Sequence, residues 1–261
     1  MSYQQHYNKL PFRPTSWLPV TQVCRRWRGA ALRLPALWSN IEITNRYRFE
    51  FIELQITRSQ DYPLNLVAWF GKTLWRNSQV VDLTELVISL LHRTRSLALY
   101  KDVHQDSTFP MLLTAPAPQL KSFACLMSTS AIPSNFFAHQ APKLEELNLN
   151  YALLPNPLPE CFVDLKILKL GISPRTGWSL IHQLIQKSKR SLRVLDLHGS
   201  PPNDDSRNFE SKPLHLIGAE RLNIHFDQAG VSTMVKLFSI IRIQSTTLVV
   251  LGGSLTTDFP Q

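Results

Sequence analysis

Three features that would place this chain in a membrane or in the secretory pathway are missing from its sequence. No apolar run reaches the roughly 18 residues that a membrane-spanning helix needs. The first ten residues, MSYQQHYNKL, contain no apolar core segment of the kind that a signal peptide has. The chain also contains no Asn-x-Ser/Thr glycosylation acceptor. We therefore expect a cytoplasmic or nuclear protein that does not associate with membranes.

Cysteine is scarce, and histidine does not cluster. The three cysteines, Cys24, Cys125 and Cys161, are odd in number, far apart and in apolar surroundings, which predicts buried free thiols in a reducing compartment. None of the eight histidines stands at metal-ligand spacing beside a cysteine or a carboxylate. We therefore expect no metal site and no cofactor.

Catalytic motifs are missing as well. The segment Phe70–Thr73 (FGKT) ends like a phosphate-binding loop, but Leu66 stands where that loop needs a glycine for backbone amides to surround the phosphate. No Gly-x-Ser-x-Gly elbow occurs. The pair Asp204 and Asp205 lies in a segment rich in proline, asparagine and serine, which predicts a solvated turn. We expect that the protein is not an enzyme.

Acidic residues are outnumbered, 19 against 28 Lys and Arg, which gives a formal net charge of +9 and a sequence pI near 9.7. A nucleic-acid-binding protein concentrates such charge and interleaves it with aromatic residues. Here the two basic clusters, Arg25–Arg33 and Lys187–Arg193, fill the polar faces of predicted amphipathic helices. This distribution of the basic residues disfavours a nucleic-acid partner, whereas the net positive charge favours encounter with an acidic protein.

What the sequence does contain is a repeat. The pattern Leu-x-x-Leu-x-Leu begins at Leu144, Leu165 and Leu192, and weaker copies lie on both sides. Successive copies are mostly 20 to 29 residues apart, the spacing of leucine-rich repeats. This rhythm predicts an α/β fold, a leucine-rich-repeat solenoid over residues 44–261 with a curved parallel sheet. The predicted strands centre on residues 41, 64, 97, 123, 147, 168, 195, 222 and 251.

The connections between these strands are predicted to be of two kinds. Single apolar stripes at helical spacing predict helices, whereas proline-rich segments predict extended or turn-like connections, because proline cannot donate a backbone hydrogen bond. The repeats also lack the regularly placed Asn or Cys that satisfies the turn backbone in standard repeats. The predicted helices are Arg48–Arg58, Val80–His92, Gly177–Ser188 and Val231–Ile243, and the predicted extended segments are Ala115–Pro118, Pro155–Pro159 and Ser200–Pro202.

Strand side chains alternate between the two faces of a sheet. Residues that alternate with the core leucines therefore lie on the concave face of the predicted solenoid, where a protein substrate would bind. Each of them is also compatible with an ordinary solvent-facing strand residue. The candidates are Tyr100, Glu146, Asn148, Asn150, Lys169, Asp196, His198, Arg221, Asn223 and His225.

The segment Thr21–Ile43 differs from the repeats. It begins with apolar residues at three- and four-residue steps, continues through Pro35 into a second short turn or helix, and ends in an alternating Ile41-x-Ile43 strand pattern. The sequence Val-Cys-Arg-Arg-Trp-Arg followed by Leu-Trp-x-x-Ile-x-Ile is similar to the F-box proteins of mushroom-type fungi. The predicted organisation is a loose arm at 1–16, a partial F-box at 17–43 and the repeats at 44–261.

This resemblance implies a substrate receptor of a cullin-type (SCF) ubiquitin ligase. Val23, Leu37 and Trp38 would bind a Skp1-like adaptor, Trp27 would be structural, and the repeats would bind a protein substrate. Trp27 and Trp38 are also compatible with core residues that join the helices to the first repeat. The motif is incomplete, because Leu10–Arg13 (LPFR) lacks the usual glutamate and no first helix follows. The alternative is therefore a non-ligase repeat scaffold in which the F-box remnant only caps the solenoid.

Overall fold

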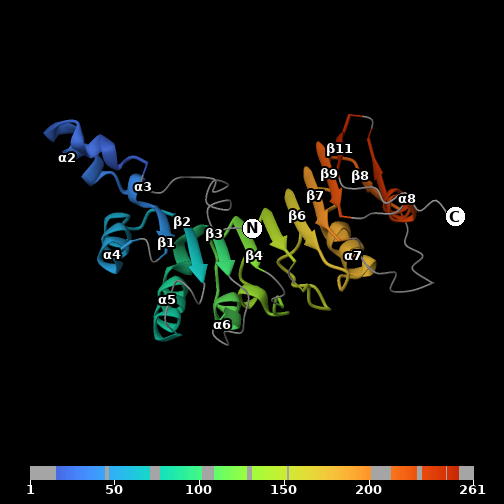
Figure 1. The fold of residues 1–261 in the computed structure, drawn as a ribbon, viewed down its shortest axis with the longest axis horizontal. Coiled ribbons are helices and arrows are strands. Elements are labelled where there is room, and N and C mark those ends of the chain that lie inside the picture. The colour runs from blue at the N-terminus through green and yellow to red at the C-terminus, as the bar shows by residue number, and fades with distance from the viewer. Residues whose placement is uncertain are drawn as a thin grey trace.

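A computed structural model describes residues 16–44, 47–70, 77–101, 109–127, 131–151, 153–200, 213–227, 231–244 and 246–252. Within these ranges, nine strands form one parallel sheet, and their order follows the chain from β1 to β7 before β8 and β10 are skipped (Figure 1). The nine strands are β1 (Asn40–Ile43), β2 (Leu64–Phe70), β3 (Thr94–Lys101), β4 (Ser122–Met127), β5 (Glu146–Asn150), β6 (Ile167–Ile172), β7 (Val194–Gly199), β9 (Arg221–Phe226) and β11 (Leu248–Gly252).

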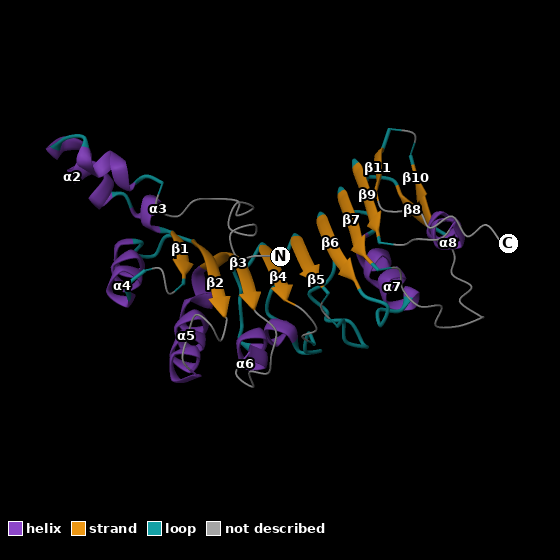
Figure 2. Ribbon diagram, viewed as in Figure 1, coloured by secondary structure: helices purple, strands orange, loops and turns teal. Residues whose placement is uncertain are grey.

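Helices connect many of these strands, and α5, α6 and α7 lie along one side of the sheet (Figure 2). Two short strands, β8 (Leu214–Leu216) and β10 (Ile241–Ile243), form a separate parallel pair. The helices are η1 (Leu18–Gln22), α2 (Arg25–Arg33), α3 (Pro35–Trp38), α4 (Phe49–Arg58), α5 (Asn77–Leu90), η2 (Leu91–Arg93), α6 (Phe109–Thr114), η3 (Phe136–His139), α7 (Trp178–Ser188) and α8 (Val231–Ile240).

The core lies between the sheet and these helices, and it consists of rows of apolar side chains that run across the strands. Neighbouring strands pair in register, so every strand adds one residue to each row, and helix residues such as Ile52, Val87 and Ile181 close the layer. Burial of these rows supplies the main drive for folding. The second row, which is important below, contains Ile43, Ala68, Leu99, Cys125, Leu149, Leu170, Leu197, Ile224 and Leu251.

The nine predicted strands and their parallel arrangement are confirmed, but the predicted register is wrong at two of them. Leu66, rather than Leu64, pairs with Leu97, and Val249, rather than Leu251, pairs with Leu222. Both shifts are by two residues, which leaves every side chain on the predicted face because the strand period is two.

The helix predictions are confirmed at α4, α5 and α7, and corrected at the C-terminal end. The predicted helix Val231–Ile243 ends at Ile240, and its last three residues form β10, which pairs with β8. Ile241 and Ile243 flank Arg242, an alternation that suits a strand better than the last turn of a helix. Helix α6 was not predicted, because only six residues form it and Pro110 stands in its first turn.

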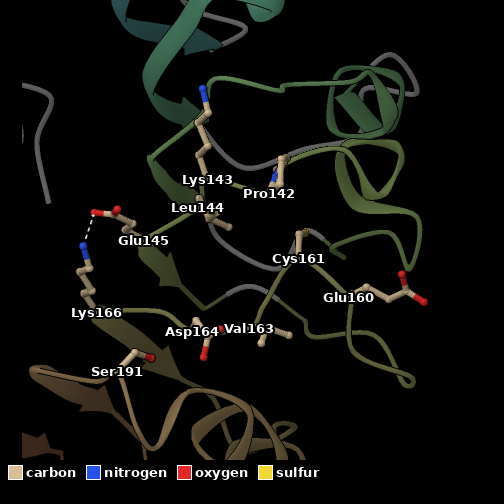
Figure 3. A pocket seen from close by; sticks show the side chains of 11 residues that line it. Pro142, Lys143, Leu144, Glu145, Glu160, Cys161, Val163, Asp164, Lys166 and Ser191 are labelled. Carbon is tan, nitrogen blue, oxygen red and sulfur yellow. Dashed lines mark ion pairs between the residues drawn. The ribbon is translucent and has the colours of Figure 1, made fainter. Parts of the chain in front are cut away.

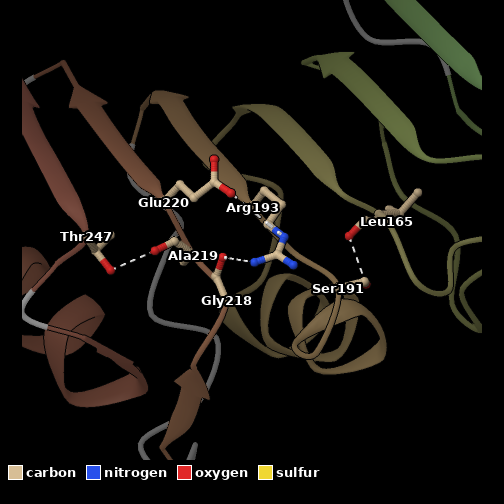
Figure 4. A network of polar contacts seen from close by, with 7 residues as sticks. All are labelled: Leu165, Ser191, Arg193, Gly218, Ala219, Glu220 and Thr247. Atoms are coloured by element: carbon tan, nitrogen blue, oxygen red, sulfur yellow. Dashed lines mark hydrogen bonds and ion pairs between the residues drawn. The ribbon is translucent and has the colours of Figure 1, made fainter.

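Side chains at the starts of the strands replace the missing Asn or Cys of the standard repeat (Figure 4). Ser191 Oγ donates to the carbonyl of Leu165 at 3.0 Å, and Thr247 Oγ1 donates to the carbonyl of Ala219 at 2.8 Å. Arg193 Nη1 reaches the carbonyl of Gly218 at 3.1 Å. Each bond joins two successive connections 25 to 28 residues apart, so backbone carbonyls at this edge of the sheet gain hydrogen-bond partners.

The cysteine prediction holds only in part. Cys125 is buried in the core and Cys161 is half-buried, whereas Cys24 is exposed. Cys24 stands just before α2 in an extended conformation, so it does not join the apolar face of that helix. All three are free thiols.

Several predictions fall outside the described residues. These are the arm at residues 1–15 with Leu10–Arg13, the Gly71–Thr73 part of the loop-like motif, the Asp204 and Asp205 pair, and the prolines after Ser200.

Candidate functional site

The sheet face away from the core carries the second set of alternating residues, and we name it the distal face. Its part over β5 to β9 is polar, and it brings together nine of the ten predicted concave-face residues. They occupy three neighbouring rows: Glu146 and Arg221 in the first, Asn148, Lys169, Asp196 and Asn223 in the second, and Asn150, His198 and His225 in the third.

Hydrogen bonds within the second and third rows, and a contact between His198 and Asp196 that joins the two rows, form a polar network. His198 Nε2 lies 3.1 Å from Asn150 Oδ1, and Asn223 Nδ2 donates to Asp196 Oδ2 at 3.4 Å. The other ring nitrogen of His198 is 3.6 Å from Asp196 Oδ1. The interaction with His198, supported by Asn223 and the charge of Lys169, holds the pKa of Asp196 below its usual value although partial burial opposes this. The network orients its side chains before any partner binds.

Gly171 makes the link between Asn150 and His198 possible. These two residues are on β5 and β7, with β6 between them, and Gly171 occupies the middle position of the row. A Cβ atom at Gly171 would lie 2.3 Å from Asn150 Oδ1 and 2.9 Å from Asn150 Cα. The glycine therefore leaves the space in which the two side chains meet.

Over β2 to β4 the distal face is apolar and buried, and Tyr100 belongs to this part. Its ring stacks on Trp69 with centroids 4.0 Å apart, and Val67 and Ala98 complete the cluster. Burial, with a contribution from the charge of Glu42, raises the pKa of Tyr100 to about 12. Tyr100 therefore lies on the predicted face of the sheet, but only 7% of it is exposed, so its neighbours cover it there.

A pocket of about 440 Å³ opens near the starts of β5 and β6 (Figure 3). Across it, Lys166 Nζ forms an ion pair with Glu145 at 3.0 Å, and the hydrogen bond from Lys166 lowers the pKa of Glu145. Cys161 lines the same pocket, and burial raises the pKa of its thiol to about 11. A thiol with this pKa stays protonated at neutral pH and is a poor nucleophile, so the pocket does not suggest cysteine chemistry.

A second pocket, of about 410 Å³, lies on η1, α2 and α3 at the far N-terminal end of the described chain. We name it the α2 pocket. Its lining is mainly apolar, and two of its residues, Trp27 and Leu34, expose 53% and 50% of their surface, while Val23 at the end of η1 exposes 65%. Arg28 Nε donates to the carbonyl of Thr21 at 2.9 Å and ties η1 to α2. The lining residues are Val20, Arg26, Trp27, Ala30, Ala31, Leu34 and Leu37.

The three predicted adaptor-binding residues lie in different environments. Val23 is exposed at the end of η1 and Leu37 lines the α2 pocket, so both are accessible to a partner. Trp38 is 3% exposed, and its Nε1 donates to the carbonyl of Ala31 at 3.0 Å. Its ring also meets Trp17 edge-on, with centroids 4.6 Å apart. The expectation that Trp38 contacts an adaptor is therefore corrected: this side chain is interior, and Trp27, expected to be structural, is on the surface.

The sequence contained a signal for the α2 pocket, namely an apolar stripe, but it did not show whether the rest of the chain covers that stripe. Val23, Trp27, Ala30 and Leu34 follow one another at three- or four-residue steps, which predicts one face of a helix, although in the structure the extended Cys24 separates Val23 from α2. Such a stripe predicts burial against something, either the rest of the chain or another molecule. Only the tertiary structure shows that most of this stripe is left uncovered.

Within the described ranges, no group of three or more His, Cys, Asp or Glu side chains could hold a metal ion. In the same ranges, no helix has both the length and the apolarity to cross a bilayer. Compared with known proteins, the chain matches no family model and no curated sequence.

Proposed function

We propose that this protein is the substrate receptor of a cullin-type ubiquitin ligase. In this proposal η1, α2 and α3 are a partial F-box that binds a Skp1-like adaptor through the α2 pocket. The nine-stranded sheet with its connections is an irregular leucine-rich-repeat solenoid, and its distal face over β5 to β9 binds a protein substrate. The protein performs no chemistry of its own.

The observation that carries the proposal is the uncovered apolar surface around the α2 pocket. Trp27 and Val23 expose more than half of their surface to water, and exposed apolar clusters on a folded protein mark interaction sites. Tryptophan at the centre of such a cluster is the side chain most often found to dominate binding energy. Arg26 lines the pocket, and Arg25, Arg28 and Arg33 are exposed elsewhere on α2, a charge that favours an acidic partner surface.

The two surfaces suit a receptor because they are far apart on one body. The α2 pocket lies beyond β1, whereas the polar network lies on β5 to β9 (Figure 1). In-register strand pairing and a shared core connect them. A body of this kind holds a substrate at a fixed distance from whatever the adaptor recruits, which raises the effective concentration of the two reactants.

Binding of the full-length chain to a purified Skp1-like adaptor, measured by isothermal titration calorimetry, tests the proposal. Trp27→Ala should weaken binding by about 2 kcal/mol or more, which is roughly thirtyfold, as loss of a central tryptophan anchor does. Met111→Ala on α6 is the matched control, since Met111 is also an exposed apolar side chain, at 62%, and lies away from the pocket. Wild-type protein that does not bind the adaptor, or binding that Trp27→Ala leaves unchanged, contradicts the proposal.

The burial of Trp38 supports a second candidate function. Trp38, Trp17 and Arg58 pack together beside β1, with the Arg58 guanidinium 5.0 Å from the Trp38 ring centre. This packing is what a cap at the end of a repeat array requires, and a scaffold without ligase function would need nothing more. A pure cap, however, does not explain why Trp27 and Leu34 remain exposed on its outer side. Absence of adaptor binding would favour this scaffold.

A further inference from the structure

Strand β11 ends the sheet with an exposed apolar edge. It pairs with β9 on one side, and no other strand in the described ranges pairs with its other side. The strand is held firmly: the Leu248 amide donates to the carbonyl of Glu220 at 3.0 Å, and Thr247 bonds to the carbonyl of Ala219. Its free edge is therefore part of the ordered sheet.

The side chains of β11 indicate that one more strand is missing. Leu251 is the last member of the second core row, and its counterparts Leu197 and Ile224 are 0% and 1% exposed. Leu251 itself is 54% exposed. Every internal strand has a neighbour on both sides and buries this position, and at the other edge Ile43 is buried where α3 and α4 pack on β1. Leu251 has no neighbouring strand on its outer side in the described ranges, so the free edge suits a strand with an apolar residue opposite Leu251.

Backbone directions define which groups this occupant would bond. Because the Leu248 amide points to β9 and successive residues of a strand alternate in direction, Val250 also points to β9. Val249 and Leu251 then point their N–H and C=O groups outward. Proteins usually protect such an edge with charged residues or proline, but the sequence LVVLG contains neither.

We propose that a second copy of this chain occupies this edge, with the two β11 strands antiparallel about a twofold axis through Val250. Val249 then lies opposite Leu251 of the partner subunit, and the two outward-facing residues of each copy form four hydrogen bonds across the axis. Opposed residues in an antiparallel pair lie on the same face, so both cores fall on one side of a continuous sheet. The core row that contains Leu251 in one copy then continues into the core row that contains Val249 in the other.

A second copy fits better than an unrelated strand because this edge is complementary to itself. A twofold axis at Val250 places every outward donor opposite an acceptor, and Val249 opposite leucine on both sides of the axis. No charged side chain of β11 meets its own copy there. The net charge of +9 on each copy still opposes association at long range. Because salt screens this repulsion, dimerisation should strengthen as the salt concentration rises.

Sedimentation equilibrium of the full-length protein over a wide concentration range measures this association. A single pair of five-residue strands is a small interface, so we expect a dissociation constant in the micromolar range. Leu251→Lys places a charge next to the axis, opposite Val249 of the partner subunit, and Leu251→Pro removes an outward N–H without removing a bond to β9. Each should weaken the dimer at least about tenfold, as loss of a central interface contact does. Met111→Lys, the control, should leave it unchanged.

A cysteine scan identifies the axis directly. The Val250 pair is not hydrogen-bonded, so its two Cα atoms are about 4.5 Å apart, within the range that a disulfide bridges. In a Cys24→Ser background, which removes the exposed native thiol, Val250→Cys should form a covalent dimer under mild oxidation. Leu248→Cys, which is equally exposed but lies away from the axis, should not.

The proposal is overturned if the wild-type protein stays monomeric at high concentration. It is also overturned if the dimer tolerates both Leu251 variants, or if Leu248→Cys cross-links as efficiently as Val250→Cys. These measurements contain no adaptor, and Trp27→Ala should dimerise normally, so their outcome is independent of the proposed ligase function.

Discussion

The two halves of the sheet differ in how their distal face and their edge strand are covered. In the half formed by β1 to β4, the edge strand is covered by α3 and α4, and the distal face is apolar and buried around Trp69 and Tyr100. In the half formed by β5, β6, β7, β9 and β11, the distal face is polar from β5 to β9, and the edge strand β11 leaves Leu251 half-exposed. Because each strand contacts mainly its neighbours, a cap at one end of the sheet does not stabilise the other end. The distal face and the edge strand are covered in the first half of the sheet, whereas both are more open in the second half.

The largest expected effect comes from a variant that disrupts the cap beside β1, in which Trp17, Trp38 and Arg58 pack together. Trp38→Ala removes the contact with Trp17 and the hydrogen bond to Ala31, and it leaves a cavity beside β1. We expect a loss of about 3 to 5 kcal/mol in the free energy of unfolding, as for other buried tryptophans, measured by urea denaturation. Trp27→Ala, at an exposed position, is the control and should cost under about 1 kcal/mol. Equal losses would mean that the two tryptophans are not in the environments described.

Ile43 and Leu251 sharpen the comparison because they are the two ends of the same core row. Ile43 is 1% exposed and Leu251 is 54% exposed. Ile43→Ala should therefore lower the free energy of unfolding by about 2 to 5 kcal/mol, whereas Leu251→Ala should lower it by under about 1 kcal/mol. Thermal or urea denaturation at low protein concentration, where association is absent, measures both. A large loss at Leu251 in the monomer would contradict the exposed edge.

Two glycines, one in each half, should respond with opposite signs. At Gly171 a new Cβ would meet backbone atoms of Asn150 and Tyr151 at 2.9 Å, so Gly171→Ala should destabilise by about 1 to 3 kcal/mol, as overpacking does. At Gly29, in α2, the nearest atom would be an Arg33 side chain at 4.0 Å. Gly29→Ala should stabilise by about 0.5 to 1 kcal/mol, because alanine favours a helix interior. Calorimetric melting of both variants tests the pair.

The smallest effect concerns acid stability of the polar half. The folded pKa of Asp196 is lowered, so its contribution is fully present above the unfolded pKa of about 3.9 and is lost as the pH falls through the lower folded pKa. Asp196→Asn should remove this part of the pH dependence. We expect a difference under about 1 kcal/mol for this partly exposed group, measured as unfolding free energy between about pH 2 and pH 6. Parallel curves for the two proteins would contradict the network.

The repeated leucines predicted the strands because their period is tied to burial. A core-row residue such as Leu147 or Leu195 must be apolar because it faces the core. The spacing of such residues therefore predicted all nine strands and the face on which each side chain lies. Register needed more information at the ends. Leu64 and Leu66 are both buried, and only strand pairing shows which of them faces Leu97.

The sites were harder to predict than the strands. Alternation placed the polar residues of the distal face, but the link over Gly171 depends on a distance across three strands that no local pattern records. Tyr100 obeys the same alternation and is nevertheless buried, because its neighbours in the row are Trp69 and Leu126. In α2, helical periodicity identified the apolar stripe, whereas the covering of Trp38 depends on Trp17 and Arg58, well separated from it in sequence.

The hydrogen bonds at the strand starts have a mechanical consequence. Ser191, Arg193 and Thr247 each tie one connection to the connection before or after it, and no single bond spans the whole sheet. A force applied to the two chain ends would therefore load these bonds one after another. Strands β6, β7 and β9 follow one another at 27-residue intervals, so each release should free about 9 nm of chain. Extension with optical tweezers should show a staircase of nearly equal steps in this region.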